Sequence, residues 1–261
     1  MSLLDQDGVR VTVHDAVATV TLTNAARRNA QTPALWHALA ETGRRLTGDI
    51  RVVVLRAEGV SFSAGLDRRA LTPEGIDGQL SLFDLARAPE PERDARIASY
   101  QEAFTWWRRP DLVSVAAVQG HAIGAGFQLA LACDLRVCAE DAQFAMRETS
   151  LGLVPDLGGT HPLVGLVGYA RALELCATGR AVRAAEAERV GLANLVVPAE
   201  ELASATEDLV AALLAAPRGA LIETKALLRA ATRQDYDTQR ATERAAQGRR
   251  LVELAGLTGL D

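Results

Sequence analysis

Gly120-His-Ala-Ile-Gly-Ala-Gly-Phe-Gln128 places three glycines between an apolar run and a run of helix formers. Residues 112–118 precede it and predict a buried strand, while residues 127–132 follow it and predict a helix. Glycine permits positive φ angles and a close approach of the backbone to a ligand. The start of a helix also leaves N–H groups without partners, at the positive end of the helix dipole. Two interpretations remain open: a site for a negatively charged oxygen, or a tight turn that binds nothing.

A second strand followed by a small-residue turn lies upstream. Residues 52–55 form a short, largely β-branched run that predicts a buried strand, and the turn Ser61-Phe-Ser-Ala-Gly-Leu-Asp67 comes after it. Two such turns can bring two backbone N–H groups to one ligand oxygen, which is the arrangement of an oxyanion hole.

Composition narrows the class of protein. The chain has 261 residues, of which 49% are hydrophobic, and a net charge of −5, which argues against general binding of nucleic acid or of a membrane surface. The sequence shows no signal peptide and no apolar run long enough to span a bilayer. Its three cysteines form no CxxC pair and predict free thiols, and neither they nor the histidines have the spacing of metal ligands. We therefore expect a cytoplasmic protein without a metal site.

Periodicity predicts an α/β chain that becomes entirely helical near residue 160. Residues 68–95 are irregular and rich in proline, glycine and charge, so we expect a mobile surface loop there. Thr32-Pro33 predicts a helix start with proline at the first helical position. The predicted strands are 9–13, 17–23, 52–55, 112–118, 135–138 and 143–146, and the predicted helices are 33–46, 92–109, 161–177, 184–190, 199–215, 217–232 and 235–253.

Two carboxylates are candidates for acid–base chemistry. Glu148 follows the strand predicted at 143–146, and Asp156 follows Pro155 in a glycine-rich turn. A carboxyl group in a partly desolvated pocket has a raised pKa and can exchange protons near neutral pH. Structural interpretations stay open, because Asp156 could cap a helix that starts near Gly159 and Glu148 could be a solvated surface residue. A serine hydrolase using Ser63 and His121 has no support from their spacing.

Four blocks together resemble the crotonase (enoyl-CoA hydratase/isomerase) superfamily, and the resemblance runs from about Val9 to Leu251. The blocks are residues 62–67, 118–134, 142–148 and 151–160. The resemblance implies an α/β fold, a crotonase-like spiral of ββα repeats. Residues 1–195 would form the spiral core domain and residues 196–261 a C-terminal helical region that makes homotrimers, often paired into hexamers.

The resemblance also implies a ligand and a site. The ligand would be an acyl-CoA thioester, with coenzyme A as part of the substrate and no metal or other cofactor. The N–H groups of Leu66 and Ala125 correspond to the oxyanion hole of the family. The loops 27–30 and 64–67 correspond to CoA-binding loops, in which arginines 27, 28, 68 and 69 would attract phosphates. The residues expected to bind substrate are Arg28, Ala30, Ala64, Gly65, Asp67, Gly124, Gln128 and, in a late helix, Lys225.

One departure from the family pattern bears on the reaction. Hydratases of the family carry two glutamates; the second matches Glu148, but the first falls on Gln128, which cannot exchange a proton near neutral pH. Asp156 occupies the acid–base position of several isomerases of the superfamily. We therefore favour double-bond isomerisation through Asp156 and Glu148. The alternatives are hydration by Glu148 alone, and a CoA-ester-binding protein with little turnover. The chain also ends, at Asp261, before the expected final helix of the family.

Overall fold

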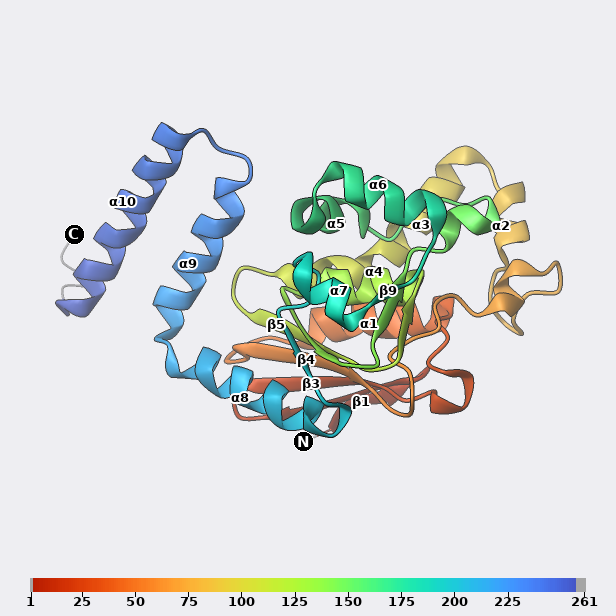
Figure 1. Ribbon diagram of the computed structural model, residues 1–261, viewed down its shortest axis with the longest axis horizontal. Coiled ribbons are helices and arrows are strands. Elements are labelled where there is room, and N and C mark those ends of the chain that lie inside the picture. The colour runs from red at the N-terminus through yellow and green to blue at the C-terminus, as the bar shows by residue number, and fades with distance from the viewer. Residues whose placement is uncertain (1, 257–261) are drawn as a thin grey trace.

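A seven-stranded sheet forms the base of the molecule. The computed structural model describes residues 2–256 and gives this sheet the order β1-β2-β3-β4-β5-β7-β10 (Figure 1). Strands β1 to β3 pair antiparallel, and β3, β4, β5, β7 and β10 pair parallel. The strands are β1 (Ser2–Gln6), β2 (Val9–His14), β3 (Val17–Leu22), β4 (Val52–Ala57), β5 (Val113–Val118), β7 (Leu135–Ala139) and β10 (Leu195–Val197).

A second, smaller layer turns the parallel strands into a spiral. It contains β6 (His121–Ile123), β8 (Gln143–Ala145) and β9 (Val182–Arg183). β6 pairs parallel with β8, and Ser63 forms a parallel bridge to Ala122. After β4, β5 and β7 the chain therefore makes the same step into the second layer, and the turns stack on one another.

Helices cover both faces of the large sheet. Helix α8 packs on one face, against a cluster that includes Val54, Val115 and Val137. Helices α1, α3 and α4 contribute to the larger core on the opposite face. The helices are α1 (Pro33–Arg45), α2 (Leu82–Arg87), α3 (Glu90–Thr105), α4 (Ala125–Ala132), α5 (Thr160–Val167), α6 (Tyr169–Thr178), α7 (Ala184–Arg189), α8 (Leu202–Ala215), α9 (Arg218–Ala231) and α10 (Tyr236–Leu254). Single 3₁₀ turns are Ala25–Arg27, Arg68–Leu71, Trp106–Arg108, Glu148–Leu151 and Ala199–Glu201.

Helices α9 and α10 form a hairpin that projects from the layered core (Figure 1). Helix α9 has no buried residue within the single chain, although Leu228 and its other apolar residues follow helical spacing. Within residues 2–256, no helix has the length and apolar character needed to cross a membrane.

Several predicted elements are confirmed. The hairpin β2–β3, strand β4 and strand β5 lie where the sequence predicts them. Helix α1 begins after Thr32, whose hydroxyl accepts a hydrogen bond from the Leu35 N–H at 3.1 Å. The glycine-rich turn between β5 and α4 is also where it is expected.

Other expectations are wrong. Residues 68–95 are not one irregular loop. Helix α2 lies within them and starts with a capping box between Ser81 and Asp84, and α3 begins at Glu90. The helix predicted at 161–177 is divided at Gly168, whose φ is 77°. The chain is not entirely helical after residue 160, because β9 and β10 both join sheets.

The predicted boundary at residue 195 falls at the start of β10, which pairs with β7. The division into domains 1–195 and 196–261 stays a prediction, and residues 257–261, including the expected early end at Asp261, lie outside the described residues.

Candidate functional site

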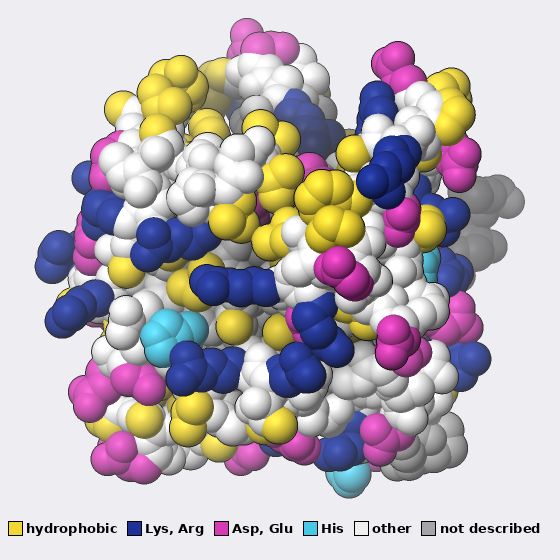
Figure 2. All heavy atoms as spheres, turned by 90° about the vertical axis from the view of Figure 1, so that its right-hand side faces the viewer, with side chains coloured by type: hydrophobic (Ala, Val, Ile, Leu, Met, Phe, Trp, Pro, Cys, Tyr) yellow, Lys and Arg dark blue, Asp and Glu magenta, His cyan; other side chains and the backbone are white. Residues whose placement is uncertain are grey.

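A cavity of about 690 Å³ lies beside the two small-residue turns. Residues 64–66 and 123–125 line it on the side of the turns, and Gln128, Glu148 and Asp156 supply polar groups. Its apolar wall comes from α1, α2, α3 and the 3₁₀ turn before α2, through Trp36, Leu71, Leu82, Leu85, Ile97 and Tyr100. On the side of the molecule where α2 lies, hydrophobic side chains gather beside a group of basic ones (Figure 2). Such a cavity suits a ligand with an apolar chain and an anionic part.

Hydrogen bonds join the two turns directly. The Ser63 N–H donates to the His121 carbonyl at 2.8 Å, and the Ser63 carbonyl accepts from the Ile123 N–H at 3.0 Å. Gly65 has a φ of +86°, and a Cβ on it would lie 2.4 Å from the Ile123 carbonyl and 3.6 Å from the Ala125 nitrogen. Only glycine fits this position, and its backbone lies next to the Ala125 amide.

Leu66 and Ala125 both line the cavity. Among residues 2–256, neither N–H has a hydrogen-bond acceptor, although the N–H groups of Asp67 and Gly124 on either side do have one. Ala125 is the first residue of α4, so its N–H lies at the positive end of that helix. The two groups can therefore donate to an oxygen supplied by a ligand.

Gln128 links the two candidate carboxylate segments. Its side chain is buried, and its Nε2 donates to Glu148 Oε1 at 2.7 Å. Its Oε1 accepts from the Leu157 N–H at 2.9 Å and from the Gly159 N–H at 3.3 Å. One amide thus orients Glu148 and holds the turn that carries Asp156.

Glu148 and Asp156 have perturbed acidity. Burial raises the pKa of Glu148, hydrogen bonds from its own backbone and from Gln128 oppose the rise, and the charge of Asp156 adds to it. Asp156 is exposed at the surface of the cavity, yet the protein atoms around its carboxyl group partly desolvate it and raise its pKa. Glu148 Oε2 is buried and has no hydrogen-bond partner among the described residues. Asp156 does not cap α5, which has no side-chain cap.

A basic opening of about 440 Å³ adjoins the main cavity and shares Ala64, Leu66 and Arg68 with it. Asp67 is buried there and pairs with Arg69 at 2.8 Å, and the Arg69 hydrogen bond lowers the pKa of Asp67 despite its burial. Arg28 also lines this opening, and neither Arg28 nor Arg68 forms an ion pair with any residue in 2–256. Their guanidinium groups are therefore the ones left for an anionic ligand.

The structure brings most of the expected site residues together. Around the main cavity lie Ala64, Gly65, Leu66, Gly124, Ala125, Gln128, Glu148 and Asp156, and around the basic opening lie Arg28, Ala30 and Asp67. Within residues 2–256, no group of three or more His, Cys, Asp or Glu side chains could hold a metal ion.

Lys225 lies apart from these residues. Its ammonium donates to Asp134 Oδ2 at 2.7 Å and to the carbonyls of Arg109 and Leu112 at 2.7 Å and 2.6 Å. A fully bonded, largely buried ammonium on α9 does not line the cavity, so the structure does not support the expectation that Lys225 binds substrate.

The apolar wall was not predicted. Trp36 and Tyr100 pack with their rings tilted by 52°, at a centroid distance of 5.0 Å, and line the cavity from two different helices. The sequence predicts helices that contain Trp36 and Tyr100. It does not indicate that these two side chains face a cavity, because that depends on tertiary packing.

Comparison with known proteins identifies the family of the chain. The sequence model of the enoyl-CoA hydratase/isomerase family matches residues 12–253. A structure assigned as an enoyl-CoA hydratase from Thermobifida fusca YX has a TM-score of 0.91 and 49% identity, over 96% of this chain and 95% of that chain. A second structure assigned as an enoyl-CoA hydratase from Thermobifida fusca YX, in complex with acetoacetyl-CoA, has a TM-score of 0.91 and 50% identity. The match covers 94% of this chain and 95% of that chain. The crotonase fold predicted from the four sequence blocks is confirmed.

Curated relatives match over a shorter length. A peroxisomal Delta(3,5)-Delta(2,4)-dienoyl-CoA isomerase from Arabidopsis thaliana is 37% identical over 148 residues, which is 57% of this chain and 52% of the relative. The chain spans between about half and two thirds of the length of the curated relatives it matches.

Proposed function

Because the chain belongs to the enoyl-CoA hydratase/isomerase family, we propose that it acts on an acyl-CoA thioester. The N–H groups of Leu66 and Ala125 would hold the thioester oxygen as it gains enolate charge. Each such donor is worth roughly 3 kcal/mol of the barrier. The solved relative with acetoacetyl-CoA bound supports this class of ligand. Coenzyme A is then part of the substrate, and Arg28 and Arg68, which line the basic opening, would bind its phosphates.

Double-bond isomerisation is the reaction that we favour. A base removes a proton from C2 of a 3-enoyl thioester, the oxyanion hole stabilises the dienolate, and the proton returns at C4 to give the 2-enoyl thioester. No water is consumed, so one carboxylate is enough. The observation that carries this proposal is Gln128, whose amide donates to Glu148 where a two-carboxylate hydratase needs a second acid. Asp156, which lines the cavity and has a raised pKa, would move the proton.

The experiment offers a 3-enoyl-CoA and follows formation of the 2-enoyl product. We expect Asp156→Asn to reduce kcat by at least about 10²-fold, the usual contribution of a general base. Arg249→Met, which breaks the ion pair between Arg249 on α10 and Glu223 on α9, is the matched control and should keep full activity. Full isomerase activity in Asp156→Asn would remove Asp156 from the mechanism.

Hydration is the second candidate, and the unpartnered Glu148 Oε2 favours it. That oxygen could take a proton from water added across a 2-enoyl thioester. Rapid hydration of a short 2-enoyl-CoA, lost in Glu148→Gln and kept in Asp156→Asn, would select this reaction. Tight binding of the thioesters without any product would instead select the third alternative, a CoA-ester-binding protein.

Assembly into a homotrimer or hexamer belongs to the same proposal. Large apolar side chains on the projecting hairpin are exposed in the single chain, as at Leu228 (68%) and Leu254 (77%). Such residues are typical of a surface that another subunit covers. A cytoplasmic location stays a prediction.

A further inference from the structure

Helix α4 carries two parts of the proposed site on one short rod. The Ala125 N–H lies at its first residue, and Gln128 lies one turn later. Its eight residues span about 12 Å at 1.5 Å per residue. Whatever holds its far end therefore sets the direction in which both groups point.

Two arginines hold that far end by its carbonyl groups. Arg108 donates from Nη2 to the Leu131 carbonyl at 2.8 Å and from Nε to the Ala132 carbonyl at 3.2 Å. Arg136 donates from Nη1 to the Cys133 carbonyl at 3.0 Å. The last carbonyls of a helix have no partner within it, and a cation at that end is also stabilised by the helix dipole.

Arg136 is an unusual residue for this purpose because its side chain is only 1% exposed. Its nearest acceptors are main-chain carbonyls, including that of Leu192 at 2.5 Å, and no carboxylate of residues 2–256 forms an ion pair with it. Burial accordingly lowers the pKa of its guanidinium. Burying a charge costs several kcal/mol, but a guanidinium offers five N–H donors in one fixed plane, more than any neutral side chain, and can therefore join several carbonyls at once.

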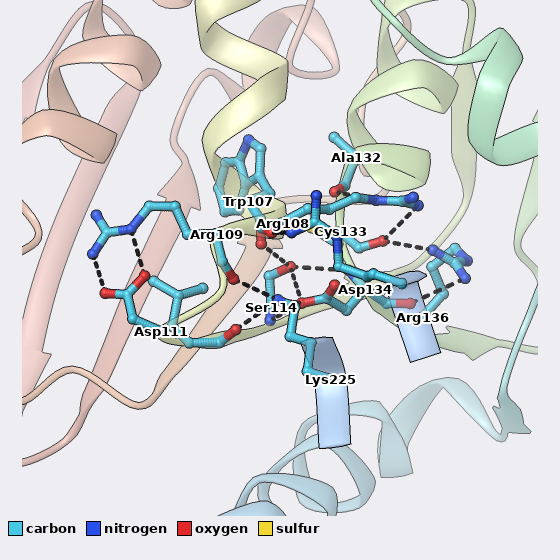
Figure 3. A network of polar contacts seen from close by, with 12 residues as sticks. Trp107, Arg108, Arg109, Asp111, Ser114, Ala132, Cys133, Asp134, Arg136 and Lys225 are labelled. Carbon is cyan, nitrogen blue, oxygen red and sulfur yellow. Dashed lines mark hydrogen bonds and ion pairs between the residues drawn. The ribbon is translucent and has the colours of Figure 1, made fainter. Parts of the chain in front are cut away.

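Lys225 connects the same end to the projecting hairpin. It reaches from α9 to Asp134, whose Oδ2 also accepts from the Ser114 N–H at 2.9 Å (Figure 3). The Asp134 N–H donates back to Ser114 Oγ at 2.9 Å. The Lys225 and Asp134 side chains are only 10% and 19% exposed. This ion pair therefore joins α9, strand β5 and the residue that directly follows the C-cap of α4.

We propose that Arg108, Arg136 and Lys225 form a cationic clasp that positions α4, so that Ala125 and Gln128 face the thioester. The clasp residues are positioning residues, since none of them lines the cavity. Through Lys225, the C-terminal hairpin α9–α10 helps to hold α4 in position. The inference rests on the proposed function for its effect on rate, although the clasp itself can be observed without turnover. A displacement of about 1 Å at reacting groups can cost about 10²-fold in rate.

The experiment compares Lys225→Met and Asp134→Asn with the double variant, in the full chain and with the favoured thioester. We expect each single variant to lower kcat at least tenfold while KM changes less than twofold. The kcat of the double variant should be no lower than that of the less active single variant. Arg249→Met is the matched control, because it breaks the exposed Arg249–Glu223 pair of the same hairpin. A raised KM with unchanged kcat in Lys225→Met would overturn the proposal and make Lys225 a substrate-binding residue.

Amide hydrogen exchange separates the clasp from the reaction. In Lys225→Met and in Arg108→Lys, we expect the amides of residues 128–132, which are hydrogen-bonded within α4, to exchange at least tenfold faster, while those of β4 stay unchanged. Unchanged exchange in α4 in both variants would overturn the clasp even if the enzyme is active. If wild-type protein turns over no thioester but the variants loosen α4, the proposed function fails and the clasp stands. Asp134→Asn keeps the test available should Lys225→Met fail to fold, because it preserves the size of the side chain.

Discussion

At the scale of single residues, Gln128 decides which chemistry the site can perform. Its amide uses both of its ends: the oxygen receives two backbone N–H groups and the nitrogen donates to Glu148. A carboxylate could accept the same two N–H groups but could not donate. Glu148 is thereby held in one orientation with one oxygen free, and Asp156 is left as the second group that can exchange a proton.

The variant Gln128→Glu tests this reasoning. It keeps the acceptors for Leu157 and Gly159 but sets a second carboxylate against Glu148, so one of the two must hold a proton. We expect hydration of a 2-enoyl-CoA to increase by about 10²-fold and isomerisation to decrease. The product ratio in a coupled assay measures both. Hydration that is already fast in the wild type, and slower in this variant, would contradict the isomerase interpretation.

The raised pKa of Glu148 also predicts a pH-dependent stability. The pKa of a free glutamate side chain is about 4.3. The raised pKa of Glu148 means that its carboxylate binds a proton more tightly in the folded protein than in the unfolded chain. The free energy of unfolding should therefore fall as pH rises from about 4 through the folded pKa, and Glu148→Gln should not show this loss. We expect the Tm of the variant relative to the wild type to increase between pH 4 and pH 8. A constant difference across that range would show that burial does not penalise the carboxylate.

At the scale of elements, the site depends on two turns that pack backbone against backbone. A Cβ at Gly120 would lie 2.1 Å from the Val60 carbonyl, and one at Gly126 would lie 2.6 Å from the Ser63 carbonyl. The glycines of the motif therefore serve contact between the turns as well as access to a ligand.

Gly65→Ala should separate the turns. Its positive φ alone costs a few kcal/mol at most, roughly 1–3, and the Ile123 carbonyl adds a clash at 2.4 Å. We expect kcat to fall by about 10²-fold, because the Leu66 and Ala125 amides lose their common orientation. Gly78→Ala is the control, since its φ is +73° and nothing lies within 4 Å of the added Cβ. Equal activity of the two variants would exclude a role for the packing of the turns.

Elements with a local signal could be predicted from the sequence, and those decided by distant partners could not. The glycine spacing located the turn before α4, and Thr32-Pro33 located the start of α1. Helix α2 has six residues among prolines and glycines, too few to show a period, yet its leucines form the cavity wall. The family resemblance predicts that Lys225 binds substrate, and nothing near it in the sequence indicates its partner, Asp134, which lies 91 residues away.

At the scale of the whole molecule, the hairpin α9–α10 would connect the proposed assembly to the proposed site. Its apolar residues are exposed in one chain, and its lysine is bonded at the end of α4. A subunit that covers the hairpin would also hold the clasp in place. Assembly and activity are then expected to be lost together.

Light scattering measures the assembly directly. We expect about 83 kDa for three chains of 27.7 kDa each, or twice that for a hexamer. Leu228→Glu combined with Leu254→Glu should move the mass to one chain, because charge on a covered apolar surface is costly. Arg249→Met, which removes an exposed charge of the same hairpin, is the control and should leave the measured mass unchanged. A monomeric wild type with full activity would contradict this picture.

The most direct test of the central claim is a structure of the protein with an acyl-CoA thioester bound. We predict that the thioester oxygen accepts hydrogen bonds from both the Leu66 and the Ala125 nitrogen, each at about 2.7–3.2 Å, with the acyl chain in the cavity beside Asp156 and Glu148. An oxygen bound to only one of the two amides, or a thioester lying outside the cavity, would contradict the account.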